Sequence, residues 1–92
     1  MAKTGSKTII CGIPFNVIER DSFEDDCIMG ECDIIQSSLF VYKKMPKETK
    51  DATLVHEWIH AVLQHSGIKH KEILVSVLAN ELYREGFRVR VQ

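Results

Sequence analysis

The feature that most constrains this chain is an apolar run in which two histidines and a glutamate recur at helical spacing. Residues 53–63 are TLVHEWIHAVL, and within them His56, Glu57 and His60 form the pattern His-Glu-x-x-His. Residues four apart lie one above the other on an α-helix, so His56 and His60 can bind one metal ion together. Glu57 lies about 100° around the helix, where its carboxylate reaches a water beside the metal. The pattern predicts a helical metal site with Glu57 as general base.

The alternative is an ordinary helix in which these three polar residues occur by chance. Their apolar neighbours cover nearly the whole circumference of the helix, which predicts burial on most sides. Burial of unpaired polar groups costs on the order of several kcal/mol. Because a shared metal ion removes that cost, the sequence favours the metal site.

Length, charge and hydropathy limit what else the chain can do. The 92 residues make one small domain with room for one site, and the apolar fraction of 45% supports a folded core. A net charge of −1 argues against a nucleic-acid surface that depends on bulk charge. No apolar run approaches the roughly 18 residues of a membrane span, and the first residues lack a signal-peptide core. We expect a cytoplasmic protein without nucleic-acid or membrane partners.

The chain has three cysteines, and an odd number favours free thiols over a disulfide framework. Cys11, Cys27 and Cys32 are candidates for a second metal site, but their spacing is loose and no fourth ligand is evident. We therefore predict that they are small buried apolar residues.

Short β-branched runs in the first half of the chain predict a small sheet. Two pairs of these runs are separated by turn residues and predict two β-hairpins, which cover residues 8–11 with 15–20 and residues 30–35 with 39–42. The small polar residues 1–6 predict a mobile tail.

Two helices follow the predicted sheet. The first is expected from Pro46 to about Gln64, with a stop at Ser66-Gly67. The second is expected from about Lys69 to Glu85, and the alternating residues 87–92 after it predict a short last strand. The fold class is therefore α+β: one domain over residues 1–92, with about four antiparallel or mixed strands packed on the two helices.

A catalytic zinc ion needs a third protein ligand and one open position for water. The metzincin pattern is excluded, because Leu63 and Ser66 stand where that pattern has a glycine and its third histidine. His65 lies about 140° around the helix from His60 and is predicted to be on the surface.

The second helix supplies the candidate third ligand. Glu72 lies at the edge of a helix face of small and apolar residues that is suited to pack on the motif helix, whereas Glu81 lies on the opposite side. Helices joined by a short connection usually pack antiparallel, which places Glu72 nearer to His60. The alternative is that Glu72 is only a first-turn acid favoured by the helix dipole. The face consists of Val75, Ala79, Leu82 and Gly86.

These motifs resemble the small ImmA/IrrE-type metallopeptidases of bacteria, phages and other mobile elements. The resemblance covers residues 53–83 and, more weakly, the preceding strands. In that family a glutamate in Glu-x-x-Ala-x-x-Phe-Ala completes the zinc site, and Glu72 begins the matching segment here, with Val75 and Leu78 in place of the alanine and phenylalanine. The resemblance implies a minimal zincin-like fold and a repressor-type regulatory protein as substrate.

Together, motif and resemblance predict a zinc metalloendopeptidase of the gluzincin kind that acts on a protein or peptide. One Zn²⁺ would be held by His56, His60 and Glu72. Tyr83 and Tyr42 are candidate donors to the oxyanion, with core or rim positions as the alternative. If residues 39–42 form a sheet edge, an extended substrate can pair with them.

Two other functions fit the same residues. One is a zincin-fold module that binds a partner protein and cuts nothing, since the small chain leaves little surface for a deep specificity cleft. The other is a structural zinc domain, which requires a fourth protein ligand that the sequence does not supply.

Overall fold

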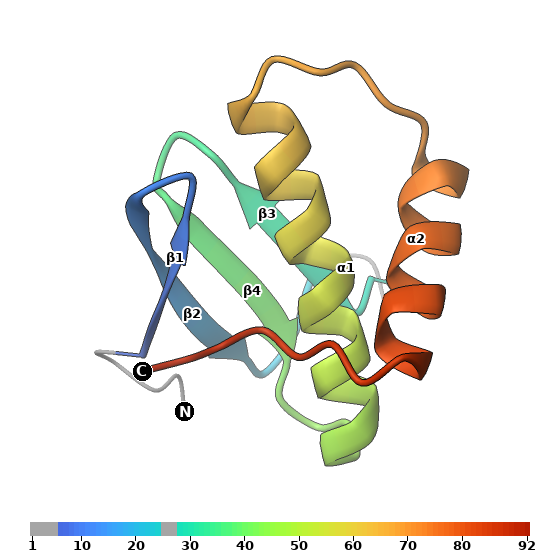
Figure 1. Cartoon of the computed structure of the whole chain (residues 1–92). Helices are drawn as coiled ribbons and strands as arrows, with labels where there is room; N and C mark the ends of the chain where they lie inside the picture. The colour runs from blue at the N-terminus through green and yellow to red at the C-terminus, as the bar shows by residue number, and fades with distance from the viewer. Residues whose placement is uncertain (1–5, 25–27) are drawn as a thin grey trace.

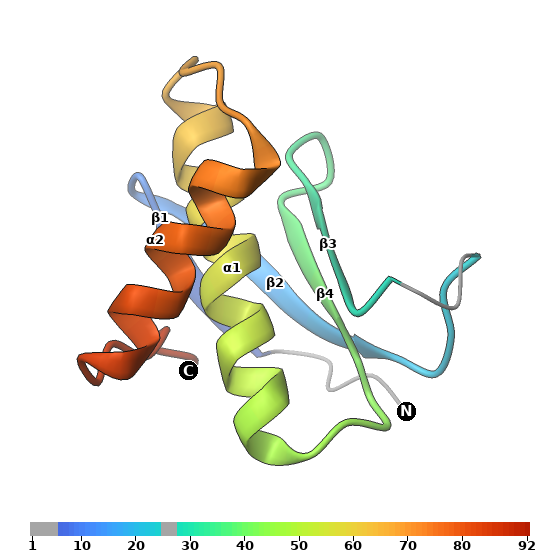
Figure 2. The same cartoon turned by 90° about the vertical axis from the view of Figure 1, so that its right-hand side faces the viewer.

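The computed structural model of the chain describes residues 6–24 and 28–92. Its α+β architecture confirms the predicted fold class. Helix α1 lies between a four-stranded sheet and helix α2 (Figures 1 and 2). The elements are β1 (Lys7–Ile10), β2 (Ile13–Arg20), β3 (Gly30–Asp33), β4 (Ser38–Tyr42), α1 (Lys47–His65) and α2 (Glu72–Arg84).

The sheet is mixed, with the strand order β1-β2-β4-β3. Strands β1 and β2 form one antiparallel pair and β3 and β4 form another, which confirms both predicted hairpins. The hairpins join through parallel pairing of β2 with β4. Strand β4 is therefore internal and β3 is the sheet edge beside α1, so residues 39–42 do not meet the condition under which a substrate strand could pair with them. Strand β4 pairs with β2 on one side and with β3 on the other, and residues 38–41 are buried without interruption, as is typical of an internal strand.

The turn between β1 and β2 explains why one cysteine is not buried. Cys11 and Gly12 have positive φ angles of 50° and 80°, as a two-residue hairpin loop requires. Cys11 is consequently exposed, and the prediction of its burial is wrong. Cys32 on β3 is half-buried, and Cys27 lies outside the described residues.

The apolar core has two parts, one on each side of α1. Trp58 packs against both parts. Between the sheet and α1 lie Ile10, Phe15, Val17, Leu39, Val41, Leu54 and Ala61. Between α1 and α2 lie Val55, Ile59, Val75 and Ala79.

Helix α1 ends where the sequence predicts. Gly67 has a φ of 73°, and the N–H groups of Gly67 and Ile68 donate to the carbonyls of Gln64 at 3.0 Å and Leu63 at 2.9 Å. This pattern is a Schellman motif. Helix α2 begins at Glu72 instead of the predicted Lys69, so residues 66–71 form an extended connection.

The two ends of the described chain meet at β1 (Figure 1). Residues 87–92 form no strand, contrary to expectation, but Gln92 exchanges two backbone hydrogen bonds with Lys7, at 2.9 and 2.8 Å. The Ser6 carbonyl accepts a hydrogen bond from Val17, so Ser6 is bonded to the sheet and does not belong to a mobile tail. Residues 1–5 of the predicted tail lie outside the described residues. Within the described residues, neither helix has the length and hydropathy needed to cross a membrane.

Candidate metal centre

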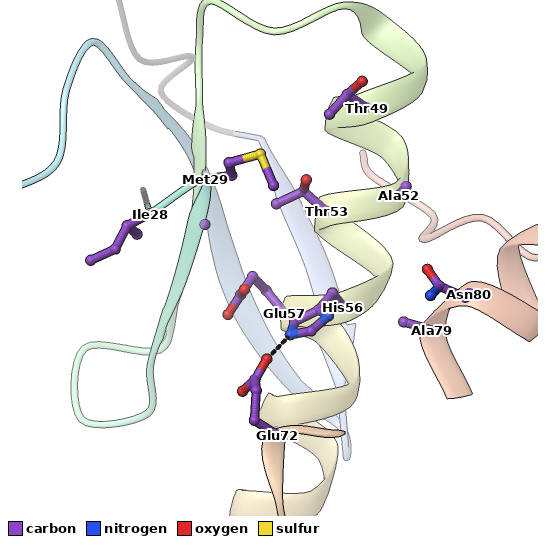
Figure 3. A pocket seen from close by; sticks show the side chains of 11 residues that line it. Ile28, Met29, Thr49, Ala52, Thr53, His56, Glu57, Glu72, Ala79 and Asn80 are labelled. Carbon is purple, nitrogen blue, oxygen red and sulfur yellow. Dashed lines mark hydrogen bonds and ion pairs between the residues drawn. The ribbon is translucent and has the colours of Figure 1, made fainter. Parts of the chain in front are cut away.

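The structure brings His56, His60 and Glu72 together. Glu72 Oε1 lies 2.5 Å from His56 Nε2, and Glu72 Oε2 lies 2.8 Å from His60 Nε2. One donor atom from each of the three side chains lies within 4.8 Å of the others. Figure 3 shows the contact between His56 and Glu72, which both line a pocket. The cluster therefore offers two imidazole nitrogens and one carboxylate to a cation.

Local structure explains why these side chains meet. The four-residue spacing places both histidines on one face of α1. After the Schellman motif, the connection brings the chain back so that Glu72, the first residue of α2, lies beside His60. Glu81 is nine residues further along α2 and pairs with Arg84 at 3.2 Å. Glu72, and not Glu81, is thus the acidic member of the cluster.

The ionisation of the cluster suits a metal ion. Burial lowers the pKa of His60, which favours the neutral imidazole that a metal binds. Burial alone would raise the pKa of the Glu72 carboxyl, but hydrogen bonding with His56 and the charges of His60 and His56 outweigh it and lower that pKa. These shifts favour the ionised carboxylate and the neutral imidazole, the forms that a metal ion binds.

The donor set also fits zinc by geometry. Two histidines and one glutamate form a known ligand set of catalytic zinc, and tetrahedral zinc with bonds near 2.0–2.1 Å separates its ligand atoms by about 3.3 Å. The Glu72 contacts at 2.5 and 2.8 Å must widen by less than about 1 Å to match it, and the two histidine nitrogens lie within 4.8 Å of each other. Because the Glu72 side chain is 66% exposed, it has room to move by this amount.

Glu57 occupies a different environment from the three possible ligands. It is 8% exposed, between α1 and the first residue of β3. No hydrogen bond or ion pair to its carboxylate occurs within residues 6–24 and 28–92. Burial, followed by the negative charges of Glu72 and Glu31, raises its pKa to about 7. A carboxyl group with this pKa can accept and release a proton near neutral pH.

Gly30 makes the position of Glu57 possible. A Cβ atom at residue 30 would lie 2.7 Å from Thr53 Cγ2 and 3.0 Å from Glu57 Cγ. Only glycine therefore allows β3 to approach α1 this closely. Gly30 was not among the residues predicted from the sequence, although its place at the start of a predicted strand next to turn-like residues was a usable signal.

We predict that Gly30→Ala lowers the free energy of unfolding by about 1–3 kcal/mol, because the methyl group overpacks this contact. Urea denaturation measures the change. Glu31→Ala is the matched control, since its ion pair with Arg20 at 3.8 Å is half-exposed and worth little. A Gly30→Ala protein as stable as the wild type would contradict the close approach.

A cavity of about 420 Å³ opens beside Glu57 and His56 (Figure 3). Apart from the site carboxylates and His56, its lining is small, apolar or uncharged. The lining includes Ile28, Met29, Thr49, Ala52, Thr53, Ala79 and Asn80. A second hollow, lined by Gln64, Lys69 and His70, lies on the other side of Glu72. Glu72 lines both hollows, so the cluster lies where they meet.

The two tyrosines considered from the sequence do not join this cluster. The Tyr83 hydroxyl donates to the Glu48 carbonyl at 3.2 Å, near the start of α1. Tyr42 follows Phe40 at a two-residue spacing on β4, so its side chain faces away from the Leu39 and Val41 layer that packs on α1. Neither tyrosine is placed to stabilise an oxyanion at the cluster.

The two histidines outside the cluster are His65 and His70, and His70 is the one that contacts it. His65 is exposed at the end of α1, as predicted. His70, which has no role in the predictions from the sequence, has its Nε2 atom 2.9 Å from His60 Nδ1. The expected start of α2 at Lys69 concealed this contact, because it placed His70 on the helix.

Comparison of the chain with protein-family models, with curated proteins and with solved structures finds no match.

Proposed function

We propose that this protein is a zinc-dependent metallopeptidase, similar in its site to the ImmA/IrrE-type enzymes, that hydrolyses a peptide bond in a protein substrate. The observation that carries the proposal is Glu57, whose side chain is mostly buried but whose carboxylate has no partner within the described residues and lines the cavity beside the cluster of two histidines and Glu72. A structural metal site has no use for such a carboxylate, whereas hydrolysis needs one as a base.

Each residue then has a distinct role in the reaction. His56, His60 and Glu72 would hold the zinc ion, which when bound would act as a Lewis acid and lower the pKa of water to about 7. Glu57 takes a proton from the attacking water, whose oxygen forms the new bond to the peptide carbon. As the carbon–nitrogen bond breaks, Glu57 gives that proton to the leaving amine. The raised pKa of Glu57 suits both transfers.

Strand β3 supplies the edge for an extended substrate. The Tyr42 N–H donates to the Met29 carbonyl at 2.8 Å. Because hydrogen bonding alternates along an antiparallel pair, the backbone N–H and C=O groups of Glu31 and Asp33 then point toward β4. The N–H and C=O groups of Gly30 and Cys32 consequently point to the free edge. A substrate strand that pairs there passes Glu57, because Gly30 contacts its side chain.

The cavity beside Glu57 and His56 suits an apolar substrate side chain. Among the described residues, its lining includes no lysine or arginine, and Met29, Ala52 and Ala79 provide apolar surface. We infer a preference for an apolar residue next to the cleaved bond. By resemblance, a repressor-type regulator is the expected substrate.

A cleavage assay on a peptide library tests the proposal and needs no identified substrate. The wild-type protein with one equivalent of zinc is incubated with a peptide mixture of broad sequence, and new termini are identified by mass spectrometry. We expect cleavage next to apolar residues that disappears with chelator and with Glu57→Gln. If the Glu57→Gln sample gave as many new termini as the wild type, the proposed peptidase activity would be refuted.

A second candidate function is a zincin-fold module that binds a partner protein without cleavage. The outer face of α2 favours it, because Ile73 is 71% exposed and Val77 is 55% exposed, with Leu74, Leu78 and Leu82 beside them. Zinc binding without new termini in the library assay would favour this module over the peptidase.

A further inference from the structure

Both ring nitrogens of His60 have partners. Nε2 lies 2.8 Å from Glu72 Oε2, on the side of the candidate metal site. Nδ1 lies 2.9 Å from Nε2 of His70. His70 in turn places its own Nδ1 3.0 Å from the carbonyl oxygen of Ile68. These contacts form one continuous chain from a backbone carbonyl to the site.

The chemistry of the carbonyl fixes the direction of this chain. A carbonyl oxygen can only accept, so His70 Nδ1 carries a proton and donates it. A neutral His70 then has a lone pair on Nε2, which accepts from the Nδ1–H of His60. A neutral His60 with its proton on Nδ1 keeps a lone pair on Nε2; since the Glu72 carboxylate is also an acceptor, the 2.8 Å contact between these two atoms needs a cation between them. This tautomer is the one that a cation at Glu72 requires.

The start of the chain of hydrogen bonds is held rigidly. The Ile68 N–H donates to the Leu63 carbonyl at 2.9 Å, within the Schellman motif that ends α1. The Ile68 carbonyl therefore has a position set by the same helix that carries His60. His70 bridges two points of one rigid element, and this bridge orients the His60 ring.

His56 differs in this respect from His60. Its Nε2 contacts Glu72, but its Nδ1 makes no hydrogen bond within the described part of the chain. Of the two imidazoles in the proposed ligand set, His60 therefore has a second partner at its Nδ1 atom, and His56 has none among the described residues. His60 is the ligand whose orientation depends on a second residue.

We propose that His70 is a positioning residue of the metal centre, which holds the proton on His60 Nδ1 and so presents His60 Nε2 to the metal ion. The inference rests on the zinc site of the proposed function but not on peptide cleavage. Partners of metal-binding histidines typically change metal affinity by about 10- to 100-fold when they are removed.

Zinc affinities of three variants, measured by competition with a chromophoric chelator, test this role. We expect His70→Ala to bind zinc about 10- to 100-fold more weakly than wild type. His70→Gln should recover most of the loss, since its amide oxygen can accept from His60 Nδ1. His65→Ala, which removes an exposed histidine, should bind as the wild type does. Unchanged affinity in His70→Ala, or no recovery in His70→Gln, would overturn the inference.

Nitrogen-15 NMR of the zinc-loaded wild-type imidazoles provides a readout that a merely structural role would not move. We expect His60 to carry its proton on Nδ1 and to bind zinc through Nε2, with the Nδ1 proton exchanging faster in His70→Ala. Zinc bound through His60 Nδ1 or by His70 itself would overturn the assignment. A wild-type protein that binds no zinc would defeat both this inference and the proposed function, whereas normal affinity in His70→Ala defeats this inference alone.

Discussion

Glu57→Gln is expected to lower the rate of peptide cleavage by about 100- to 10,000-fold, which is the usual contribution of a general base. The amide has nearly the same shape as the carboxylate but cannot take the proton from the attacking water. Zinc affinity should stay within a few-fold of wild type, because Glu57 is not one of the three clustered donors. Initial rates on a peptide identified in the library assay measure the effect. Glu81→Gln is the control, since Glu81 pairs with Arg84 on the surface and is not a member of the cluster.

The same substitution is expected to stabilise the metal-free protein at high pH. Folding raises the pKa of Glu57 from 4.5 to about 7. Between these values the folded protein keeps a proton that the unfolded chain releases, so stability falls as the pH rises and is lowest above about 7. Below pH 4.5 both states are protonated and no difference arises from this group.

Glutamine removes this dependence, because it has no proton to lose. In the presence of chelator, Glu57→Gln should exceed the wild type in free energy of unfolding by on the order of 2 kcal/mol at pH 8 and by much less at pH 5. Urea denaturation at the two pH values gives the comparison. A difference that is the same at both pH values would contradict the burial of an ionised Glu57.

The second large effect concerns the three candidate ligands. His56→Ala, His60→Ala and Glu72→Ala are each expected to abolish stabilisation by zinc, since two remaining donors hold a zinc ion poorly. In the wild type, zinc at 100 times its dissociation constant should raise the free energy of unfolding by about 2.7 kcal/mol. Thermal denaturation with and without zinc measures both results.

Glu72 and Glu81 provide a matched pair for this experiment, because both are exposed glutamates on α2. Glu81→Ala should keep the full response to zinc while Glu72→Ala loses it. The opposite result would show that α2 presents a different face to the metal in solution.

Local sequence patterns were sufficient to predict α1 and the two hairpins. The His-Glu-x-x-His run predicted α1 nearly to the residue, because Pro46 precedes it and Gly67 ends it. The two hairpins also follow from local patterns. Glu72 could be preferred over Glu81 because helical periodicity and antiparallel packing both act over short distances in the chain.

Features that depend on particular side-chain contacts or on strand pairing were missed. Lys69 to Lys71 carry no helix-breaking residue, yet they stay outside α2 because His70 reaches back to His60 and to the Ile68 carbonyl. The internal position of β4 depends on its pairing with β2. Gly30 is essential only because Thr53 and Glu57 lie against it. Such contacts either override the local propensity of the sequence or leave no sign in it.

The proposed chemistry requires that two imidazoles and one carboxylate hold a zinc ion that keeps one position open. X-ray absorption spectroscopy at the zinc edge of the wild-type protein, loaded with one equivalent of zinc, tests this requirement most directly. We expect stoichiometric binding with two imidazole nitrogens, the remaining ligands being oxygen, and loss of one oxygen ligand or of binding in Glu72→Ala. A sulfur ligand, a third imidazole or the absence of stoichiometric zinc would contradict it.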